Sequence, residues 1–152
     1  DQFIRENTKR GKRKNQKPEN LVVKDHLQWY EEDGFFMNVY ESKAKAQLIR
    51  GQEVWRTGGL EVGTPDSGGT CPNGYSCWIE FKAKGSRSRI SNDQRAHLTK
   101  VIERGGFGLC SDDVNYSKET YHKWLNKSRE DKIPFLLNEL PKSKAQEDDL
   151  PF

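Results

Sequence analysis

Residues 63–83 read GTPDSGGTCPNGYSCWIEFKA, and this stretch decides the fold around it. The Pro-Asn-Gly signal at 72–74 predicts a turn between two strands, which brings Asp66 beside Glu80. Strand side chains alternate faces, so Glu80 and Lys82 emerge on one side while Ile79 and Phe81 point to the other. The stretch therefore predicts a hairpin on which two carboxylates and one ammonium converge.

That trio suits the hydrolysis of a phosphodiester. Hard oxygen ligands with open positions for water and phosphate favour Mg2+, with Mn2+ as a substitute, and Asp66 and Glu80 are the candidate ligands. The metal would polarise the phosphate and acidify a bound water, while Lys82 positions that water or offsets developing charge. A strand whose solvent face simply carries Glu and Lys has the same spacing, so spacing alone leaves both interpretations open.

The wider sequence narrows the choice. GTPD at 63–66 is followed by IEFKAKG at 79–85, SNDQR at 91–95 and GGFGLC at 105–110. Over residues 18–113 this series resembles the VRR-NUC branch of the PD-(D/E)XK nucleases, particularly the small stand-alone bacteriophage versions. The resemblance implies an α/β, restriction-endonuclease-like fold with a mixed central sheet flanked by helices. It also implies a Mg2+-dependent endodeoxyribonuclease of phage DNA replication, recombination or repair, selective for branched, flapped or nicked DNA.

The resemblance assigns roles to individual residues. It implies Asp66 and Glu80 as metal ligands, the Phe81 carbonyl as a further oxygen, Lys82 as the catalytic lysine and Gln94 as an active-site glutamine. The chain departs from the family at residues 67–69, where Ser-Gly-Gly replaces the usual apolar residues. This departure leaves the length of the Asp66 strand open.

A helix is expected to begin near Glu19. Val23, Leu27 and Tyr30 follow at helical spacing, and Gly34 ends the pattern. Glu19 lies on the same stripe, so its carboxylate either reaches the metal centre, as the resemblance implies, or interacts with the positive end of the helix dipole. The residues alone support both roles.

A second helix is expected to open at Ser91. Gln94 at its third position predicts a capping box, and Gln94 is either that cap or an active-site group turned toward the sheet. The apolar run at 107–110 predicts a strand that pairs in parallel after this helix. Three histidines lack the spacing of a metal site or a catalytic triad and are interpreted as structural or surface residues: His26, His97 and His122.

Composition divides the chain into a basic flexible arm at 1–17, a nuclease domain at 18–137 and a linker with an acidic tip at 138–152. The arm and the loop after the catalytic strand are candidate phosphate contacts, although solvated surface charge is the alternative for each. The candidate DNA-binding residues are Lys12, Arg13, Lys14, Lys84, Arg87 and Arg89.

The last five residues, Asp148, Asp149, Leu150, Pro151 and Phe152, resemble the C-terminal tip of bacterial single-stranded-DNA-binding proteins. The resemblance implies host repair and replication enzymes that bind this tip as partners. The alternative function is therefore a nuclease-fold binding module that recruits such enzymes. An inert acidic tail and a DNA mimic that covers the protein's own basic site also remain open.

Composition also indicates where in the cell the protein is expected. The 152 residues carry a net charge of +3, only 32% are hydrophobic, and the mean hydropathy is −1.02. We expect no membrane span and no signal peptide, and three reduced cysteines, which together indicate a cytoplasmic protein, in the bacterial host if phage-encoded. DNA is the expected partner, and a homodimer is left open.

Overall fold

The computed structural model describes residues 19–40, 45–49, 52–56 and 61–142, with side chains for 19–40 and 61–142. The first described element is a helix over residues 19–33. The elements that follow are β1 (Phe36–Val39), β2 (Lys45–Ile49), β3 (Gln52–Arg56), β4 (Ser67–Thr70), β5 (Ser76–Phe81), the 3-10 turn η1 (Arg87–Arg89), α2 (Asn92–Glu103), β6 (Phe107–Ser111), α3 (Val114–Leu125) and α4 (Arg129–Glu139).

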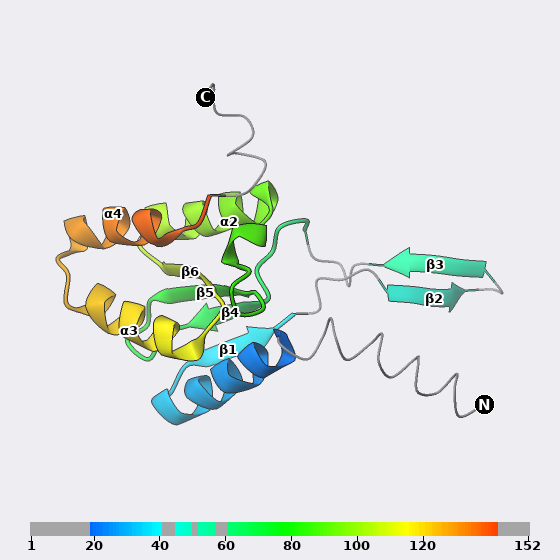
Figure 1. Cartoon of the computed structure of the whole chain (residues 1–152), viewed down its shortest axis with the longest axis horizontal. Coiled ribbons are helices and arrows are strands. Elements are labelled where there is room, and N and C mark those ends of the chain that lie inside the picture. Colours follow the sequence, from blue (N-terminus) through cyan, green and yellow to red (C-terminus); the bar gives the residue numbers. More distant parts are fainter. Residues whose placement is uncertain (1–18, 41–44, 50–51, 57–60, 143–152) are drawn as a thin grey trace, which may run out of the picture.

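A four-stranded sheet in the order β1-β4-β5-β6 forms the centre of the fold (Figure 1). β1, β4 and β5 pair antiparallel, whereas β6 pairs parallel to β5 after the α2 crossover. The expected α/β class, with a mixed central sheet flanked by helices, is therefore confirmed. The predicted hairpin is also confirmed, as is the predicted parallel strand. β2 and β3 pair only with each other and lie apart from the central sheet (Figure 1).

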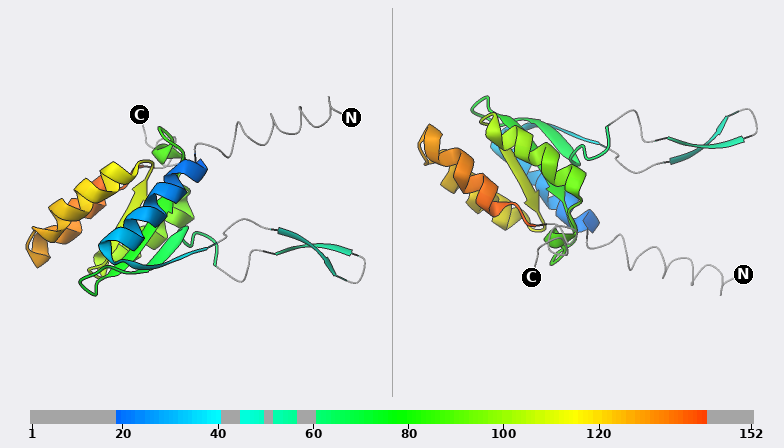
Figure 2. Two further views of the ribbon diagram at one scale, coloured as in Figure 1. Left: turned by 90° about the horizontal axis from the view of Figure 1, so that it is seen from below. Right: turned by 90° about the horizontal axis from the view of Figure 1, so that it is seen from above.

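Helices cover both faces of the central sheet. α2 and α4 lie on one face, and the 19–33 helix and α3 lie on the other (Figures 1 and 2). The second face is largely aromatic, because Trp29, Phe35 and Tyr121 contact one another with ring centroids 4.5 to 5.9 Å apart. Large buried aromatic side chains of this kind dominate the apolar stabilisation of a small core.

The Ser-Gly-Gly segment forms a regular strand in this chain. Gly68 lies directly opposite Trp78 in the β4–β5 register, and a Cβ atom at Gly68 would overlap the Trp78 indole. Position 68 therefore requires glycine, because the Trp78 indole occupies the space that a side chain at this position would fill. This packing explains the glycine at position 68.

The 19–33 helix is present, but its buried stripe differs from the predicted one. Val22, His26, Trp29 and Tyr30 face the core, whereas Leu27 is 44% exposed. The predicted stripe did not include His26, which was interpreted as a structural or surface residue and is structural. Here both of its ring nitrogens are paired, one with the Val22 carbonyl oxygen at 2.8 Å and the other with the Ser117 hydroxyl at 2.7 Å, which removes the cost of burying them.

The packed part of the chain extends beyond the boundary expected at residue 137. α4 continues to Glu139, and Leu136 and Leu140 are buried. The proposed arm and the acidic tip lie outside the described residues. None of the helices in the described ranges combines the length and apolar composition that a membrane crossing needs. Cys71, Cys77 and Cys110 are buried free thiols.

Candidate active site

A tight turn at residues 61–64 places Asp66 directly before β4. The Thr64 amide and hydroxyl both donate to the Glu61 carbonyl oxygen, at 3.2 and 2.8 Å. Gly63 has a φ of 89°, and a Cβ atom there would overlap the Asp93 backbone at the start of α2. Only glycine combines this backbone conformation with so close an approach. The turn is therefore seated on α2 immediately before the chain enters β4.

Asp66 and Glu80 are held together by reciprocal hydrogen bonds. Ser67 pairs with Ile79 in the β4–β5 register, which places Asp66 next to Glu80. The Asp66 amide donates to Glu80 Oε2 at 3.0 Å, and the Phe81 amide donates to Asp66 Oδ2 at 3.0 Å. The backbone of Asp66 thus holds the Glu80 carboxylate, and the backbone of the residue after Glu80 holds the Asp66 carboxylate. Glu80 is only 2% exposed.

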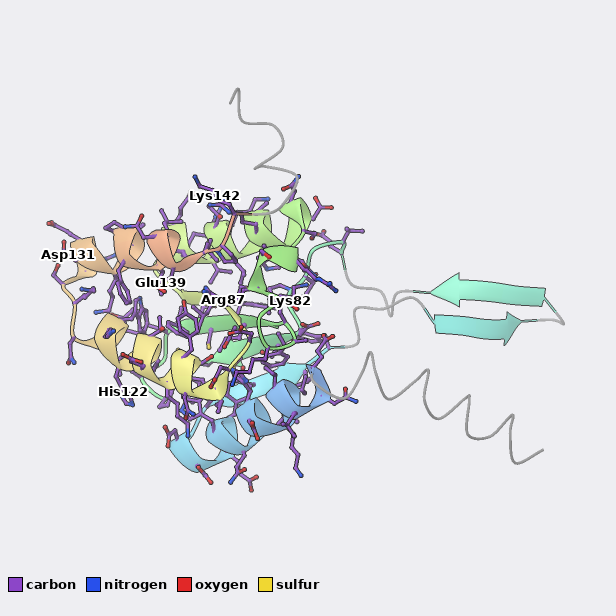
Figure 3. All side chains as sticks on the ribbon, viewed as in Figure 1. Lys82, Arg87, His122, Asp131, Glu139 and Lys142 are labelled. Atoms are coloured by element: carbon purple, nitrogen blue, oxygen red, sulfur yellow. The ribbon has the colours of Figure 1, made fainter. Side chains whose placement is uncertain are left out.

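Lys82 and Gln94 complete a hydrogen-bonded set with Glu80. The Gln94 amide nitrogen donates to Glu80 Oε1 at 2.8 Å, and Lys82 Nζ donates to Gln94 Oε1 at 3.1 Å. Lys82 Nζ also lies 3.4 Å from Glu80 Oε1, and its side chain is 17% exposed. In Figure 3, Lys82 lies on the side of the domain nearer to β2 and β3, whereas His122 and Asp131 lie toward the opposite side.

The Gln94 side chain caps α2 and is also turned toward Glu80 and Lys82. Ser91 is the N-cap of α2 and forms the predicted capping box with Gln94. Gln94 Oε1 accepts from the Ser91 amide at 3.0 Å as well as from Lys82. A carbonyl oxygen has two lone pairs, so one amide side chain can cap the helix and bind Glu80 and Lys82 at the same time.

Burial perturbs the electrostatics of this set. Removal of Glu80 from water and, to a smaller extent, the nearby Asp66 charge together raise the pKa of Glu80 to about 8, against the opposing effect of Lys82. At neutral pH Glu80 therefore retains a proton, and two adjacent ionised carboxylates are avoided. A divalent cation would reverse this balance, since metal ligands must be deprotonated.

The donor set fits a magnesium ion. Within the described ranges no group of three or more His, Cys, Asp or Glu side chains is positioned to hold a metal, so Glu19 does not join Asp66 and Glu80 in such a group. Mg2+ is commonly held by one or two carboxylates and completes its shell with water and substrate phosphate. Two carboxylates therefore suffice. The Phe81 carbonyl remains a predicted ligand.

The basic loop residues differ in their environment. Lys84 and Arg89 are exposed, as expected of phosphate contacts. The Arg87 guanidinium is instead used within the fold: it donates to the Cys110 carbonyl, the Tyr116 hydroxyl and the Glu139 carbonyl. Arg87 thus ties η1 to β6 and to the end of α4. The remaining predicted contacts, Lys12, Arg13, Lys14 and 148–152, lie outside the described residues.

The sequence interpretation overlooked an aromatic group beside the carboxylates. The Trp78 ring stacks on Tyr40, with centroids 6.1 Å apart and planes 19° apart, and contacts His97 at 5.2 Å. Strand alternation could have revealed it, since Trp78 lies two residues before Glu80 and therefore on the same face of β5.

Comparison with protein-family models, curated proteins and solved structures finds no match to this chain.

Proposed function

We propose that this protein is a metal-dependent DNA endonuclease of the VRR-NUC type that cuts branched, flapped or nicked DNA. The observation that carries the proposal is the hydrogen-bonded set of Asp66, Glu80, Lys82 and Gln94. These four side chains come from three separate parts of the chain: the segment before β4, the end of β5 with the residue after it, and α2. A strand with a merely charged solvent face would leave Glu80 in water. Glu80 is instead buried and bonded on both oxygens.

The topology supports the same proposal at the level of fold. An antiparallel hairpin carries the two carboxylates, and a helical crossover leads to a parallel strand. This arrangement is compatible with a PD-(D/E)XK fold, in which the paired carboxylates and the lysine lie on neighbouring strands. The resemblance of residues 18–113 and the order β1-β4-β5-β6 point in the same direction.

The residues divide the chemical work. Asp66 and Glu80 would hold Mg2+, which when bound supplies positive charge against the scissile phosphate and lowers the pKa of a coordinated water. Lys82 extends from the same strand face as Glu80, so its ammonium can orient the attacking water or neutralise the charge that builds on the phosphate oxygens. Gln94 fixes the position of that ammonium by accepting its hydrogen bond at 3.1 Å.

The test compares DNA cleavage and DNA binding in the same variants. Linear, nicked, flapped and four-way DNA are incubated with Mg2+, Mn2+ or EDTA. Asp66→Ala, Glu80→Ala and Lys82→Ala should each lower the cleavage rate by about a hundredfold or more, and EDTA should abolish cleavage. Lys123→Ala is the matched control, because Lys123 is a 60% exposed lysine on α3.

Binding of labelled DNA in EDTA shows whether a variant has lost chemistry or affinity. We expect Lys82→Ala to bind DNA within a fewfold of the wild type while failing to cut it. Near-normal turnover by Lys82→Ala, or cleavage that persists in EDTA, would refute the proposed mechanism.

A further inference from the structure

A cleft of about 540 Å3 opens between the 61–64 turn and the outer face of α2. Glu61 and Val62 line one wall, and Ala96, His97, Lys100 and Arg104 line the other. The close seating of Gly63 on the Asp93 backbone joins the two walls at one end. Both walls contain residues that the structure describes, on the 61–64 turn and on α2.

The two elements that wall the cleft also carry the candidate active site. The turn leads through Pro65 directly into Asp66, and Gln94 lies in the first turn of α2. At a helical rise of 1.5 Å per residue, Lys100 and Arg104 lie about 9 and 15 Å beyond Gln94 along the axis. With one phosphate per 3.4 Å of a stacked strand, this length corresponds to roughly three to four nucleotides. The cleft thus continues the path of a strand whose phosphate lies at Asp66 and Glu80.

The lining suits a nucleotide. The His97 ring is packed against Trp78, and burial and the nearby Lys100 charge lower its pKa, so the imidazole is neutral and available for stacking at neutral pH. Lys100 and Arg104 are exposed cations that can meet phosphates. Glu61 and Asp93 offer carboxylates to the amino groups of bases, which are hydrogen-bond donors.

We propose that this cleft is a subsite for one unpaired nucleotide of the strand that is cut, with its base against His97 and Val62 and its phosphates at Lys100 and Arg104. The inference rests on the proposed nuclease function and specifies its substrate. A cleft of this size accommodates a ligand the size of one nucleotide. A base pair within a duplex cannot enter, because its partner strand occupies the space outside. The substrate must therefore present an unpaired base roughly three to four nucleotides from the scissile phosphate.

Ala96→Trp tests the subsite by filling the cleft without changing its charge. Ala96 is exposed on α2 and lines the cleft, and it is not one of the candidate catalytic residues. Binding is measured in EDTA with labelled DNAs of three kinds: a flapped duplex, the same duplex with a single abasic site at each of the first four unpaired positions in turn, and a blunt duplex. The melting temperature of the variant shows whether it folds.

For the wild type we expect an abasic site at one of these positions to weaken binding by about 5- to 150-fold, the equivalent of one stacked base. Ala96→Trp should bind the intact flap as weakly as the wild type binds the abasic flap, should be insensitive to the abasic site, and should bind blunt duplex normally. Lys100→Ala should lower the salt slope of flap binding by about one, whereas the control Lys123→Ala should not. These two lysine variants keep the test decisive if Ala96→Trp fails to fold.

The outcomes separate the subsite from the enzymatic function. If Ala96→Trp and Lys100→Ala bind the intact flap like the wild type, the subsite is refuted even where cleavage is intact. If the wild type prefers the intact flap to the abasic flap but cuts no DNA with any metal, the subsite stands and the nuclease function is refuted.

Discussion

Replacing Glu80 by Gln should stabilise the metal-free protein at alkaline pH. Folding raises the pKa of Glu80 from 4.5 to about 8, so the folded protein binds this proton more tightly than the unfolded chain does. The stability that the protonated group provides is complete below pH 4.5 and is lost as the pH rises toward 8. Between about pH 5 and pH 8 the loss amounts to about 3 to 4 kcal/mol, and a Gln side chain, which cannot ionise, avoids it.

Part of that gain is offset by hydrogen bonding. Glu80 accepts from the Asp66 amide and from Gln94, and Gln retains only one oxygen for the two donors. One lost hydrogen bond costs about 1 kcal/mol, so we expect Glu80→Gln to exceed the wild type by about 2 to 3 kcal/mol at pH 8. At pH 5 the variant should be equal or slightly less stable.

Urea denaturation in EDTA at several pH values measures the difference. Glu119→Gln is the matched control: this carboxylate is 67% exposed and pairs with Lys123 on the surface, so its loss should change stability by less than about 0.5 kcal/mol at any pH. Excess Mg2+ should stabilise the wild type at pH 8 and have little effect on Glu80→Gln. Parallel stability curves for the wild type and Glu80→Gln would refute the placement of Glu80 as a buried, proton-binding ligand.

Three further outcomes follow from the packing and the charge pattern. Arg87→Lys should lower the free energy of unfolding by about 1 to 3 kcal/mol, because lysine cannot reproduce three guanidinium hydrogen bonds. Its affinity for DNA should stay unchanged. A large loss of DNA affinity without loss of stability would contradict this. Gly68→Ala should destabilise the fold by more than about 1 kcal/mol through overlap with Trp78, as measured by urea denaturation, and an unchanged midpoint would show that the indole can move aside. Deletion of residues 1–17 should weaken binding of all DNA sequences alike and reduce its salt dependence in an affinity titration, and an unaltered salt slope would show that these lysines and arginines do not contact DNA.

Much of the central sheet was predictable because its signals are local. The Pro-Asn-Gly turn set the hairpin, and Ser91 with Gln94 marked the start of α2. α4 was not predictable in this way. Pro134 lies inside it, where proline removes a helical hydrogen bond, and such a residue argues against a helix in sequence. The helix persists because Leu136 and Leu140 are buried against the rest of the fold, and that stabilisation is tertiary.

In the candidate site, too, the residues set by local signals were predictable, whereas those set by tertiary contacts were not. Alternation along β5 put Glu80 and Lys82 on one face, and the turn brought Asp66 beside them. The role of Arg87 could not be predicted, because its partners Tyr116 and Glu139 are distant in sequence and belong to α3 and α4. A basic residue in a loop after a catalytic strand has the same local pattern whether it contacts phosphate or the protein itself.

Gln94 explains why site assembly and folding are linked in this chain. Its side chain is both the cap that starts α2 and the bridge between Glu80 and Lys82. If α2 began one residue earlier or later, the side chain at this position would rotate by about 100° around the helix axis and both sets of bonds would be lost. The position of the lysine ammonium is therefore set by where the helix begins, and the same α2 register presents Ala96, His97 and Lys100 to the adjoining cleft. A shift in the start of one helix would disturb the candidate chemistry and the proposed nucleotide subsite together.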